Sequence, residues 1–507
     1  EIPLTPPRVY LVGAGPGDPS LLTLRAAELL RTADVVILDP FVSPEIVSRI
    51  GSHARIIEAR TGRKTLSQDE INRRLIEEGK KGRVVVRLKG GDPFLFGRGA
   101  EEAEALRAAG IPFEVVPGIP PAIAAPAYAG IPVMHPAHTT TVTFIAGNED
   151  GAVPIPWRAL AGLDGTLVFL GVSIEKLTSI SGRLMDQGAD PSLPAAVISQ
   201  GTTRTQKTVD GTLETIAEHA SRARLEPPAL FVVGRVAALR DTIGWFESKP
   251  LFGRTVVVTR ARGQASPFVR ILEAEGATVA HFPMIEIAPP DSWESLDLLI
   301  EELPSFSWLV FTSTNGVDHF FERLQHHGRD LRALTGTKIA AVGETTAASL
   351  HSRGIIPDIV PEKFQASALL PLFDERLDGV RIGIVRAATG REELVTELRA
   401  RGADVHLAIA YETRPTRGLS DQLGSLLGSG RLDAITFTSS STVDNFFEQL
   451  RDEEKRKVID SVRLASIGPV TSASLRAHGA EPAIEAPEAT IHALTQALVE
   501  HFRKETR

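Results

Sequence analysis

The chain has 507 residues, of which 43% are hydrophobic and 23% charged, and its formal net charge is −8. This length predicts about three or four compact units of roughly 100 to 200 residues each, and the negative charge argues against a general nucleic-acid binder. The absence of cysteine excludes disulfides and thiolate metal sites and favours a cytoplasmic protein, and no window offers the roughly 18 uninterrupted apolar residues of a membrane span.

The first predicted elements are a strand, a glycine loop, a helix and a second strand, in "VYLVGAGPGDPSLLTLRAAELLRTADVVILD" from Val9 to Asp39. A dinucleotide fingerprint needs a small residue three positions after its second glycine, and this chain has Asp18 there. A carboxylate on the first helical turn satisfies the positive end of the helix dipole and repels a phosphate. The loop therefore favours a ligand without phosphates, although Asp39 alone resembles a ribose-binding acid.

Strand-like and helix-like runs alternate along the rest of the chain, which predicts α/β layers. The rhythm breaks in "WFESKPLFGR", from Trp245 to Arg254, before the strand-like "TVVVTR" restarts it. We therefore expect two domains, at 1–247 and 252–507. The strand-like runs of the first half are "RVYLVG", "DVVILD", "RVVVRL", "FEVVPG", "VTFIAG", "TLVFLG", "AAVISQ" and "LFVVGR".

Beyond the break, the sequence repeats itself. "VVTRARGQASPFVRILEAEGATV" matches "GIVRAATGREELVTELRARGADV", and "WLVFTSTNGVDHFFERL" matches "AITFTSSSTVDNFFEQL", both at an offset of 126 residues. "IAAVGETTAASLHSRG" matches "LASIGPVTSASLRAHG" at an offset of 125 residues. Because each copy is far longer than a solenoid unit, we expect two similar α/β lobes, each copy forming its own sheet, with a cleft between them.

Small hydroxylated residues follow two strands in each copy, in "FTSTN" and "FTSSS" and in "VGETT" and "IGPVT". Open parallel sheets bind ligands at the carboxyl ends of their strands, so these tips and two arginines are candidates for holding a substrate with several carboxylates. The alternative is that the hydroxyls are helix N-caps. The predicted substrate-binding residues are Arg260, Thr312, Ser313, Arg386, Ser439 and Thr471.

Several blocks of the first half carry a family resemblance. "GAGPGDPSLLTLRA", "RLKGGDPFLFGRGAEEAEAL", "GIPFEVVPGI", "AYAGIP" and "QGTTRTQKTVDGTLETI" resemble the S-adenosylmethionine-dependent uroporphyrinogen-III C-methyltransferases over about residues 8 to 245. The resemblance implies a tetrapyrrole-methylase-type unit of two α/β subdomains. It also implies methylation of uroporphyrinogen III at C2 and C7, giving precorrin-2, and a homodimer through this half. S-adenosylmethionine carries a sulfonium cation and no phosphate, which agrees with Asp18.

The same resemblance implies roles for individual residues. Asp39 matches the family's proton acceptor, and Arg98 of "FGRG" matches an arginine that faces the tetrapyrrole. The implied cofactor-binding residues are Pro16, Gly90, Gly91, Asp92, Leu95, Pro120, Pro121, Leu170 and Ala196.

The chain departs from the family pattern inside these blocks. A lysine proposed as proton donor is replaced in "EAR" by Ala59, and Pro120 removes a hydroxyl and a backbone donor at a ligand-facing position. These departures leave open whether the methyltransferase is active or serves as a binding or scaffold module. The departing positions are Pro40, Ala59, Pro120, Met134, Pro136, Asn148 and Leu170.

The duplicated half resembles uroporphyrinogen-III synthase over about residues 252 to 502, in "FTSTN", "AVGETT" and "AYETRP". This resemblance implies two flavodoxin-like lobes and cyclisation of hydroxymethylbilane to uroporphyrinogen III, which is the substrate of the first half. Tyr411 matches the tyrosine that assists departure of the substrate hydroxyl; the alternative is a tyrosine that only packs.

Two other classes of function remain as alternatives. One is a dinucleotide-dependent oxidoreductase, against which Asp18 argues, and the other is a non-catalytic sensor or scaffold. Histidine pairs at His135 and His138 and at His326 and His327 are interpreted as loop residues, so no metal is expected.

Overall fold

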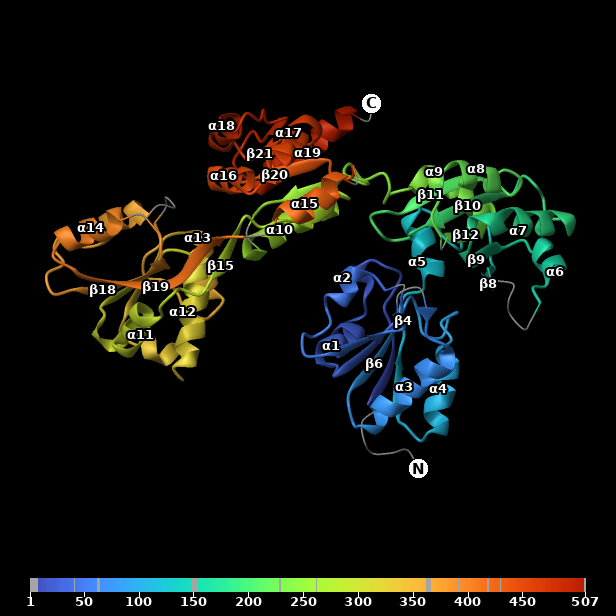
Figure 1. The fold of residues 1–507 in the computed structure, drawn as a ribbon, viewed down its shortest axis with the longest axis horizontal. Helices are drawn as coiled ribbons and strands as arrows, with labels where there is room; N and C mark the ends of the chain where they lie inside the picture. Colours follow the sequence, from blue (N-terminus) through green and yellow to red (C-terminus); the bar gives the residue numbers. More distant parts are fainter. Residues whose placement is uncertain are drawn as a thin grey trace. The chain divides into compact units, whose positions relative to one another are not determined.

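The structure is a computed structural model that describes residues 8–40, 42–61, 64–147, 154–227, 229–260, 262–361, 366–390, 392–416, 419–428 and 430–505. The chain forms two compact units (Figure 1). Unit 1 comprises Glu1–Gly253 with Glu275–Thr278, and unit 2 comprises Arg254–Ala274 with Val279–Arg507. Among the described residues, no helix has both the length and the apolar character needed to cross a bilayer.

The first half of unit 1 is built on a parallel five-stranded sheet. Its three central strands are buried on both faces, which is why they read as continuous apolar runs. The sheet order is β3 (Arg55–Glu58), β2 (Val35–Leu38), β6 (Val85–Lys89), β1 (Val9–Gly13) and β7 (Phe113–Val116). The helices of this half are η1 (Pro19–Leu21), α1 (Leu24–Thr32), α2 (Pro44–Val47), α3 (Gln68–Lys80) and α4 (Gly99–Ala108), and a short hairpin is formed by β4 (Arg60–Thr61) and β5 (Lys64–Thr65).

The second half of unit 1 is built on a mixed five-stranded sheet, in which β8 and β9 are parallel and the other pairs are antiparallel. Its order is β11 (Lys207–Thr212), β10 (Pro194–Ser199), β12 (Ala229–Val233), β9 (Thr166–Val172) and β8 (Val142–Ala146). The helices are α5 (Pro121–Tyr128), α6 (Trp157–Ala161), α7 (Ile174–Asp186), α8 (Ile216–Arg222), η2 (Arg235–Leu239) and α9 (Arg240–Ile243).

Unit 2 holds two lobes whose sheets share the order of four strands and differ in the fifth. Lobe 1 has a sheet of order β14 (Thr278–His281), β13 (Thr255–Val258), β20 (Ala434–Phe437), β21 (Arg463–Ser466) and β22 (Ile484–Glu485). This is the 2-1-3-4-5 order of flavodoxin-like folds. Its helices are α10 (Arg262–Ala274), α15 (Leu419–Gly428), α16 (Ser440–Glu448), α17 (Asp452–Ser461), α18 (Pro469–Ala477) and α19 (Ile491–Glu505).

Lobe 2 is formed by the segment between the two parts of lobe 1. Its sheet order is β17 (Lys338–Ala341), β16 (Trp308–Phe311), β18 (Arg381–Ala387), β19 (Asp404–Pro415) and β15 (Ile285–Ala288), with only β15 antiparallel to its neighbour. Its helices are α11 (Glu294–Glu301), η3 (Leu303–Ser305), α12 (Thr314–His326), η4 (Leu331–Leu334), α13 (Glu344–His351), η5 (Ala366–Leu372) and α14 (Glu393–Ala400). The expected fold class, a methylase-type two-subdomain α/β unit followed by two flavodoxin-like lobes, is confirmed.

The expectation that each sequence copy forms its own sheet is wrong. In lobe 1, β13 and β14 come from the first copy, whereas β20 and β21 come from the second. In lobe 2 the contributions are reversed, because β16 and β17 come from the first copy and β18 and β19 from the second. The two copies have therefore exchanged strands, and each sheet needs both of them.

The centre of this exchange lies in the ladder between β15 and β19. Ile287 is the direct cross-strand partner of Thr413, and these two positions are equivalent in the repeat, at the offset of 126 residues. When equivalent positions of two copies pair with each other in an antiparallel ladder, a local pseudo-twofold axis passes between them. The axis relates the two connecting strands.

Candidate functional site

Two glycine loops meet at the carboxyl edge of the first sheet of unit 1. Gly15 N donates to Gly91 O at 3.1 Å, and Gly91 N donates back to Gly15 O at 2.8 Å. Since β1 and β6 are parallel neighbours, the loops that follow them share this edge. The "GPGD" loop and the "GGDPF" loop, which the sequence analysis assigned to one cofactor site, are therefore joined by the backbone.

The glycines of this edge let three loops approach one another. A Cβ atom added at Gly13 would lie 2.5 Å from Gly91 O, and one added at Gly118 would lie 2.2 Å from the same oxygen. Gly91 also has a left-handed φ of 67°. The backbone at Gly13 and Gly118 therefore lies directly against the backbone of Gly91.

Asp92 fixes the second loop to a third. Its Oδ1 accepts from Phe94 N at 2.8 Å and Leu95 N at 3.1 Å, and its Oδ2 accepts from Gly118 N at 3.0 Å. Gly118 leads to Pro120, which stands at the N-cap of α5 without a side-chain cap, and Pro121 is the first residue of that helix. Asp92 thus holds the loop of Pro120 and Pro121 beside the glycine loops.

Asp18 is fully engaged beside the first glycine loop. Its Oδ1 accepts from Ser20 N at 2.8 Å and its Oδ2 from the Tyr128 hydroxyl at 2.8 Å. Burial and the hydrogen bond to Asp18 raise the pKa of the Tyr128 phenol. Asp18 caps the short η1 and not α1, which begins at Leu24 with its own cap. A fixed negative charge here suits a cationic ligand such as a sulfonium and opposes a pyrophosphate.

An apolar cluster joins three of the predicted cofactor residues to α5. Leu95 and Leu170 pack, partly buried, against the core that contains Ala122, Ala125 and Ala196. Ala196 is completely buried in the middle of β10, so its side chain belongs to the core.

Asn148, one of the positions that depart from the family pattern, lies outside the described residues.

Asp39 follows β2 at the same sheet edge and is held by a buried arginine. Arg87 Nη2 forms an ion pair with Asp39 Oδ1, and Arg87 is 2% exposed. Arg87 Nε donates to Glu102 Oε1 at 3.0 Å, and Lys89 Nζ donates to the same oxygen at 2.8 Å. Burial and the neighbouring Arg87 lower the pKa of the Lys89 ammonium. Two cations and two carboxylates therefore form one network beneath the site.

Sequence reasoning missed Arg87, Lys89 and Glu102. The available signal was the pair of charges at positions 87 and 89 inside the apolar run "VVVRLKG", which places both on one face of a strand.

Arg98 lies apart from the buried charges. It has a left-handed φ of 55° at the N-cap of α4. Its guanidinium is exposed and binds Glu101, with Nε at 2.8 Å and Nη2 at 2.7 Å, and this hydrogen bonding raises the pKa of Arg98. The arginine thus lies at the surface, paired with Glu101.

In lobe 2, three predicted residues gather where strands end. The Tyr411 hydroxyl lies 2.9 Å from Ser313 Oγ, and Thr312 Oγ1 donates to Val385 O at 3.2 Å. The register between β18 and β19 shifts between Arg386 and Ala387, so a bulge places Tyr411 opposite Ala387. Tyr411 is only 7% exposed.

Arg386 stands in the same lobe, at the end of β18. Its Nη1 forms an ion pair with Glu392 Oε1 at 3.1 Å, and its Nε donates to Ala387 O. The side chain is 7% exposed.

In lobe 1, the predicted residues occupy the equivalent strand ends. Ser439 caps α16 by accepting from Thr442 N at 3.3 Å, as Ser313 caps α12 by accepting from Gly316 N at 3.1 Å. Thr471 is buried in the first turn of α18. Arg260 follows β13, and burial lowers the pKa of its guanidinium. The N-cap reading is thus correct for Ser313 and Ser439.

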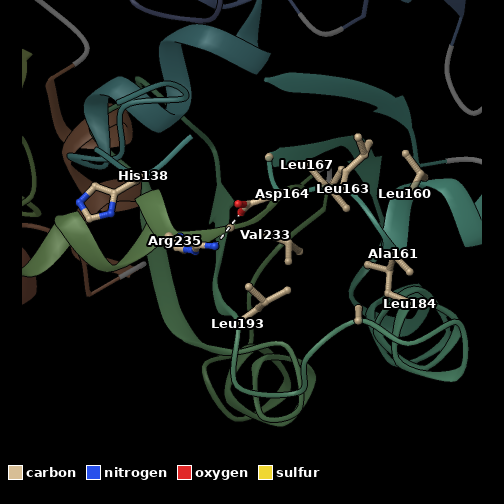
Figure 2. A pocket seen from close by; sticks show the side chains of 13 residues that line it. His138, Leu160, Ala161, Leu163, Asp164, Leu167, Leu184, Leu193, Val233 and Arg235 are labelled. Carbon is tan, nitrogen blue, oxygen red and sulfur yellow. Dashed lines mark hydrogen bonds and ion pairs between the residues drawn. The ribbon is translucent and has the colours of Figure 1, made fainter. Parts of the chain in front are cut away.

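Figure 2 shows a small cavity in the second half of unit 1, away from all of these residues. Its volume is about 30 Å³, room for one or two water molecules. Arg235 Nη2 pairs with Asp164 Oδ1 at 2.8 Å beside it. Within the described ranges, no group of three or more histidine, aspartate or glutamate side chains is arranged to hold a metal ion.

Two family models match the chain. The model described as Tetrapyrrole (Corrin/Porphyrin) Methylases matches residues 8–217, and the model described as Uroporphyrinogen-III synthase HemD matches residues 266–496. The first match falls in unit 1, and the second falls in unit 2 apart from Glu275–Thr278, which belong to unit 1.

Relatives match one or both parts. "Porphyrin biosynthesis protein HemD" of Ruminiclostridium josui is 36% identical over 497 residues, covering 97% of each chain. "Uroporphyrinogen-III C-methyltransferase" of Bacillus subtilis is 36% identical over 69% of this chain and 72% of that protein. The solved uroporphyrin III C-methyl transferase of Thermus thermophilus is 35% identical over 46% of this chain and 99% of its own, with a TM-score of 0.41. The chain belongs to the family of fused porphyrin biosynthesis proteins that join a tetrapyrrole methylase to a uroporphyrinogen-III synthase.

Proposed function

We propose that this chain is a bifunctional tetrapyrrole biosynthesis enzyme. Unit 2 cyclises hydroxymethylbilane to uroporphyrinogen III, and unit 1 methylates that product at C2 and C7 with S-adenosylmethionine to give precorrin-2. The observation that carries the methyltransferase activity is Asp18, whose carboxylate is fixed by Ser20 and Tyr128 beside the paired glycine loops. This charge favours a sulfonium over a pyrophosphate.

S-adenosylmethionine, when bound, supplies an electrophilic methyl group to a pyrrole carbon. The residues that would hold it are Pro16, Gly90, Gly91, Asp92, Leu95, Pro120, Pro121, Leu170 and Ala196, of which Asp92 acts by fixing the loops. Holding both reactants in line replaces a two-body encounter with a unimolecular one.

Asp39 is proposed to accept the proton that the tetrapyrrole loses when the methylated ring rearranges. Arg87 engages Oδ1, and the Asp39 side chain is 23% exposed, so we assign proton removal to Oδ2. Arg98, which is exposed at the N-cap of α4, is proposed to bind a carboxylate of the tetrapyrrole.

In unit 2, Tyr411 is proposed to assist loss of the substrate hydroxyl. A phenol that donates a hydrogen bond to the departing oxygen stabilises the transition state, and Ser313 orients that phenol. The carboxylates of the substrate are assigned to Thr312, Ser439, Thr471, Arg260 and Arg386.

A second candidate is a synthase fused to a methylase-like unit that binds but does not methylate. Two observations favour it. Ala59, where the family has a lysine, is 1% exposed and offers no proton, and Pro120 gives α5 no side-chain cap.

One experiment separates these functions. The protein is incubated with hydroxymethylbilane, with and without S-adenosylmethionine, and the products are separated. Uroporphyrinogen III alone and precorrin-2 on cofactor addition support the bifunctional enzyme, whereas uroporphyrinogen III in both cases supports the binding module. Calorimetry that finds NAD bound and S-adenosylmethionine not bound would overturn the assignment of unit 1. A cytoplasmic location and a homodimer through unit 1 remain predictions.

A further inference from the structure

The loop between β10 and β11, residues 200–206, holds two residues in an uncommon conformation. Gln200 has a φ of 51° and Thr202 a φ of 67°. A left-handed φ is disfavoured for a β-branched residue and persists only where the surroundings impose it. Thr202 is 2% exposed, so packing and hydrogen bonds surround it.

Gln206 imposes the conformation of Thr202. Its Oε1 accepts from Thr202 N at 2.7 Å, and Gln206 is 3% exposed. Its Nε2 donates to Glu247 Oε1 at 2.9 Å. The orientation of the amide, and with it the acceptor offered to Thr202, is therefore set by Glu247.

Glu247 is itself locked in place. Its Oε1 accepts also from Thr208 Oγ1 at 2.6 Å, and its Oε2 pairs with Arg240. Arg240 Nη1 donates to Ala129 O at 2.9 Å, at the end of α5. The Glu247 side chain is 16% exposed. It lies after α9, in the segment that leads out of unit 1.

The far end of this chain of contacts reaches the glycine loop. Thr202 Oγ1 accepts from Asp18 N at 3.2 Å. A Cβ atom on Gly17 would lie 3.2 Å from Thr202 Oγ1, so the loop packs directly on this residue. The position of Asp18 thus depends on Thr202.

We propose that Glu247 is a positioning residue for the S-adenosylmethionine site. Glu247 acts through Gln206 and Thr202 on the backbone of Asp18. This proposal rests on the proposed function of the glycine loop. The segment after α9 therefore sets cofactor affinity although it contributes no residue to the predicted cofactor site.

The test measures S-adenosylmethionine binding to the full chain by calorimetry. In E247Q, one of the two accepting oxygens becomes an NH₂ group that faces a donor, either Arg240 or the Gln206 and Thr208 donors. We therefore expect cofactor affinity to fall about tenfold, which is the scale of one lost hydrogen bond. The KM for S-adenosylmethionine should rise by the same factor, with kcat at saturating cofactor unchanged. The matched control is D164N, which breaks the exposed pair with Arg235 in the same unit and should change neither.

A second pair of variants tests the other end of the same path, between Thr202 and Asp18. T202A removes the acceptor for Asp18 N and should weaken cofactor binding, and T202S keeps the hydroxyl and should restore it. The double variant E247Q/T202A should bind no more weakly than either single variant, because both act along one path.

The outcomes separate two failures. If the unaltered protein does not bind S-adenosylmethionine, the proposed function of the glycine loop is wrong. If it binds, and E247Q and T202A bind as tightly as D164N, the positioning role of Glu247 is wrong.

Discussion

The hydroxyl oxygens of Ser313 and Tyr411 lie 2.9 Å apart, although the residues are 98 positions apart in the chain. Ser313 Oγ also accepts from Gly316 N and so caps α12. The equivalent serine of lobe 1, Ser439, caps α16 in the same way, but the position equivalent to Tyr411 is Ile285. Duplication therefore produced two serine caps, and only one of them holds a phenol.

We expect Y411F to be the slower of two variants and S313A to be the less stable. Y411F loses one hydrogen bond, which costs about 0.5–1.5 kcal/mol, and loses the phenol proposed to assist hydroxyl departure, slowing cyclisation by up to about 10²-fold. S313A keeps the phenol but loses the same hydrogen bond and the cap of α12, at about 1–2 kcal/mol or more. Cyclase rates and urea midpoints of both variants check this ranking.

Methylation of supplied uroporphyrinogen III is the internal control, because neither residue lies in unit 1. A cyclase rate that falls more in S313A than in Y411F would assign Tyr411 to packing alone.

The buried charges of unit 1 predict a large difference between two adjacent glutamates. E102Q leaves Arg87 and Lys89 without their shared carboxylate in a site that is 0% exposed, so we expect a loss of about 3–5 kcal/mol. E101Q breaks only the exposed pair with Arg98 and should cost less than about 1 kcal/mol. Denaturant unfolding followed by tryptophan fluorescence compares them. Equal losses would contradict the buried network.

The pH dependence of stability should carry a contribution from Glu78. Burial raises the pKa of its carboxyl, but hydrogen bonds from Lys81 and Arg55 outweigh this effect and lower the pKa to about 2. Because the folded pKa lies below the unfolded value of about 4.5, the stabilisation is complete above pH 4.5 and is lost as the pH falls toward 2.

E78Q should therefore be less stable than the unaltered protein at pH 7, by about 1–2 kcal/mol, because the cations are half exposed. The difference should shrink between pH 4.5 and 3. Melting temperatures across this range measure it, and a difference that is constant with pH would exclude the role of Glu78.

Strand exchange predicts which pieces of unit 2 fold. A fragment of residues 284–416 contains every strand of lobe 2 and should give a cooperative unfolding transition. A fragment of residues 254–361 contains the first sequence copy but strands of two different sheets, so it should remain unfolded. Circular dichroism of both fragments makes the comparison, and a folded 254–361 would contradict the topology.

The proposed domain division predicts that residues 252–507 retain cyclase activity without unit 1. Both lobes draw their strands and core clusters only from this range. The measurement is the cyclase rate of the fragment beside that of the full chain. An inactive fragment with an active full chain would show that the synthase depends on unit 1.

The sequence predicted the interior strands best. All eight strand-like runs of the first half became strands, because continuous or alternating apolar runs report burial directly. β3 and β11 were not predicted; both lie at sheet edges, and their side chains are exposed or only partly buried. The repeat predicted two similar lobes but not which copy supplies the strands of each sheet. Similarity at a fixed offset shows that two segments are equivalent, but it does not show which strands pair.

At the candidate sites, the sequence identified the motif residues but not the residues that hold them in place. The glycine loops, Asp92 and Asp18 follow from residue types at fixed spacing. The buried partners of Asp39 depend on which strands are neighbours, and the burial of Tyr411 depends on a bulge in β19. Long-range pairing determines both, and no local pattern records it.

The nesting of lobe 2 inside lobe 1 has a consequence during synthesis. Lobe 2 is one continuous segment and can be completed soon after β19 leaves the ribosome. β13 must instead wait for β20, since Val256 pairs with Ala434. Until then its "TVVV" strand lacks that neighbour and offers an open edge to any other nascent chain. Translation speed and chaperone supply should thus govern the yield of the synthase more strongly than its final stability does.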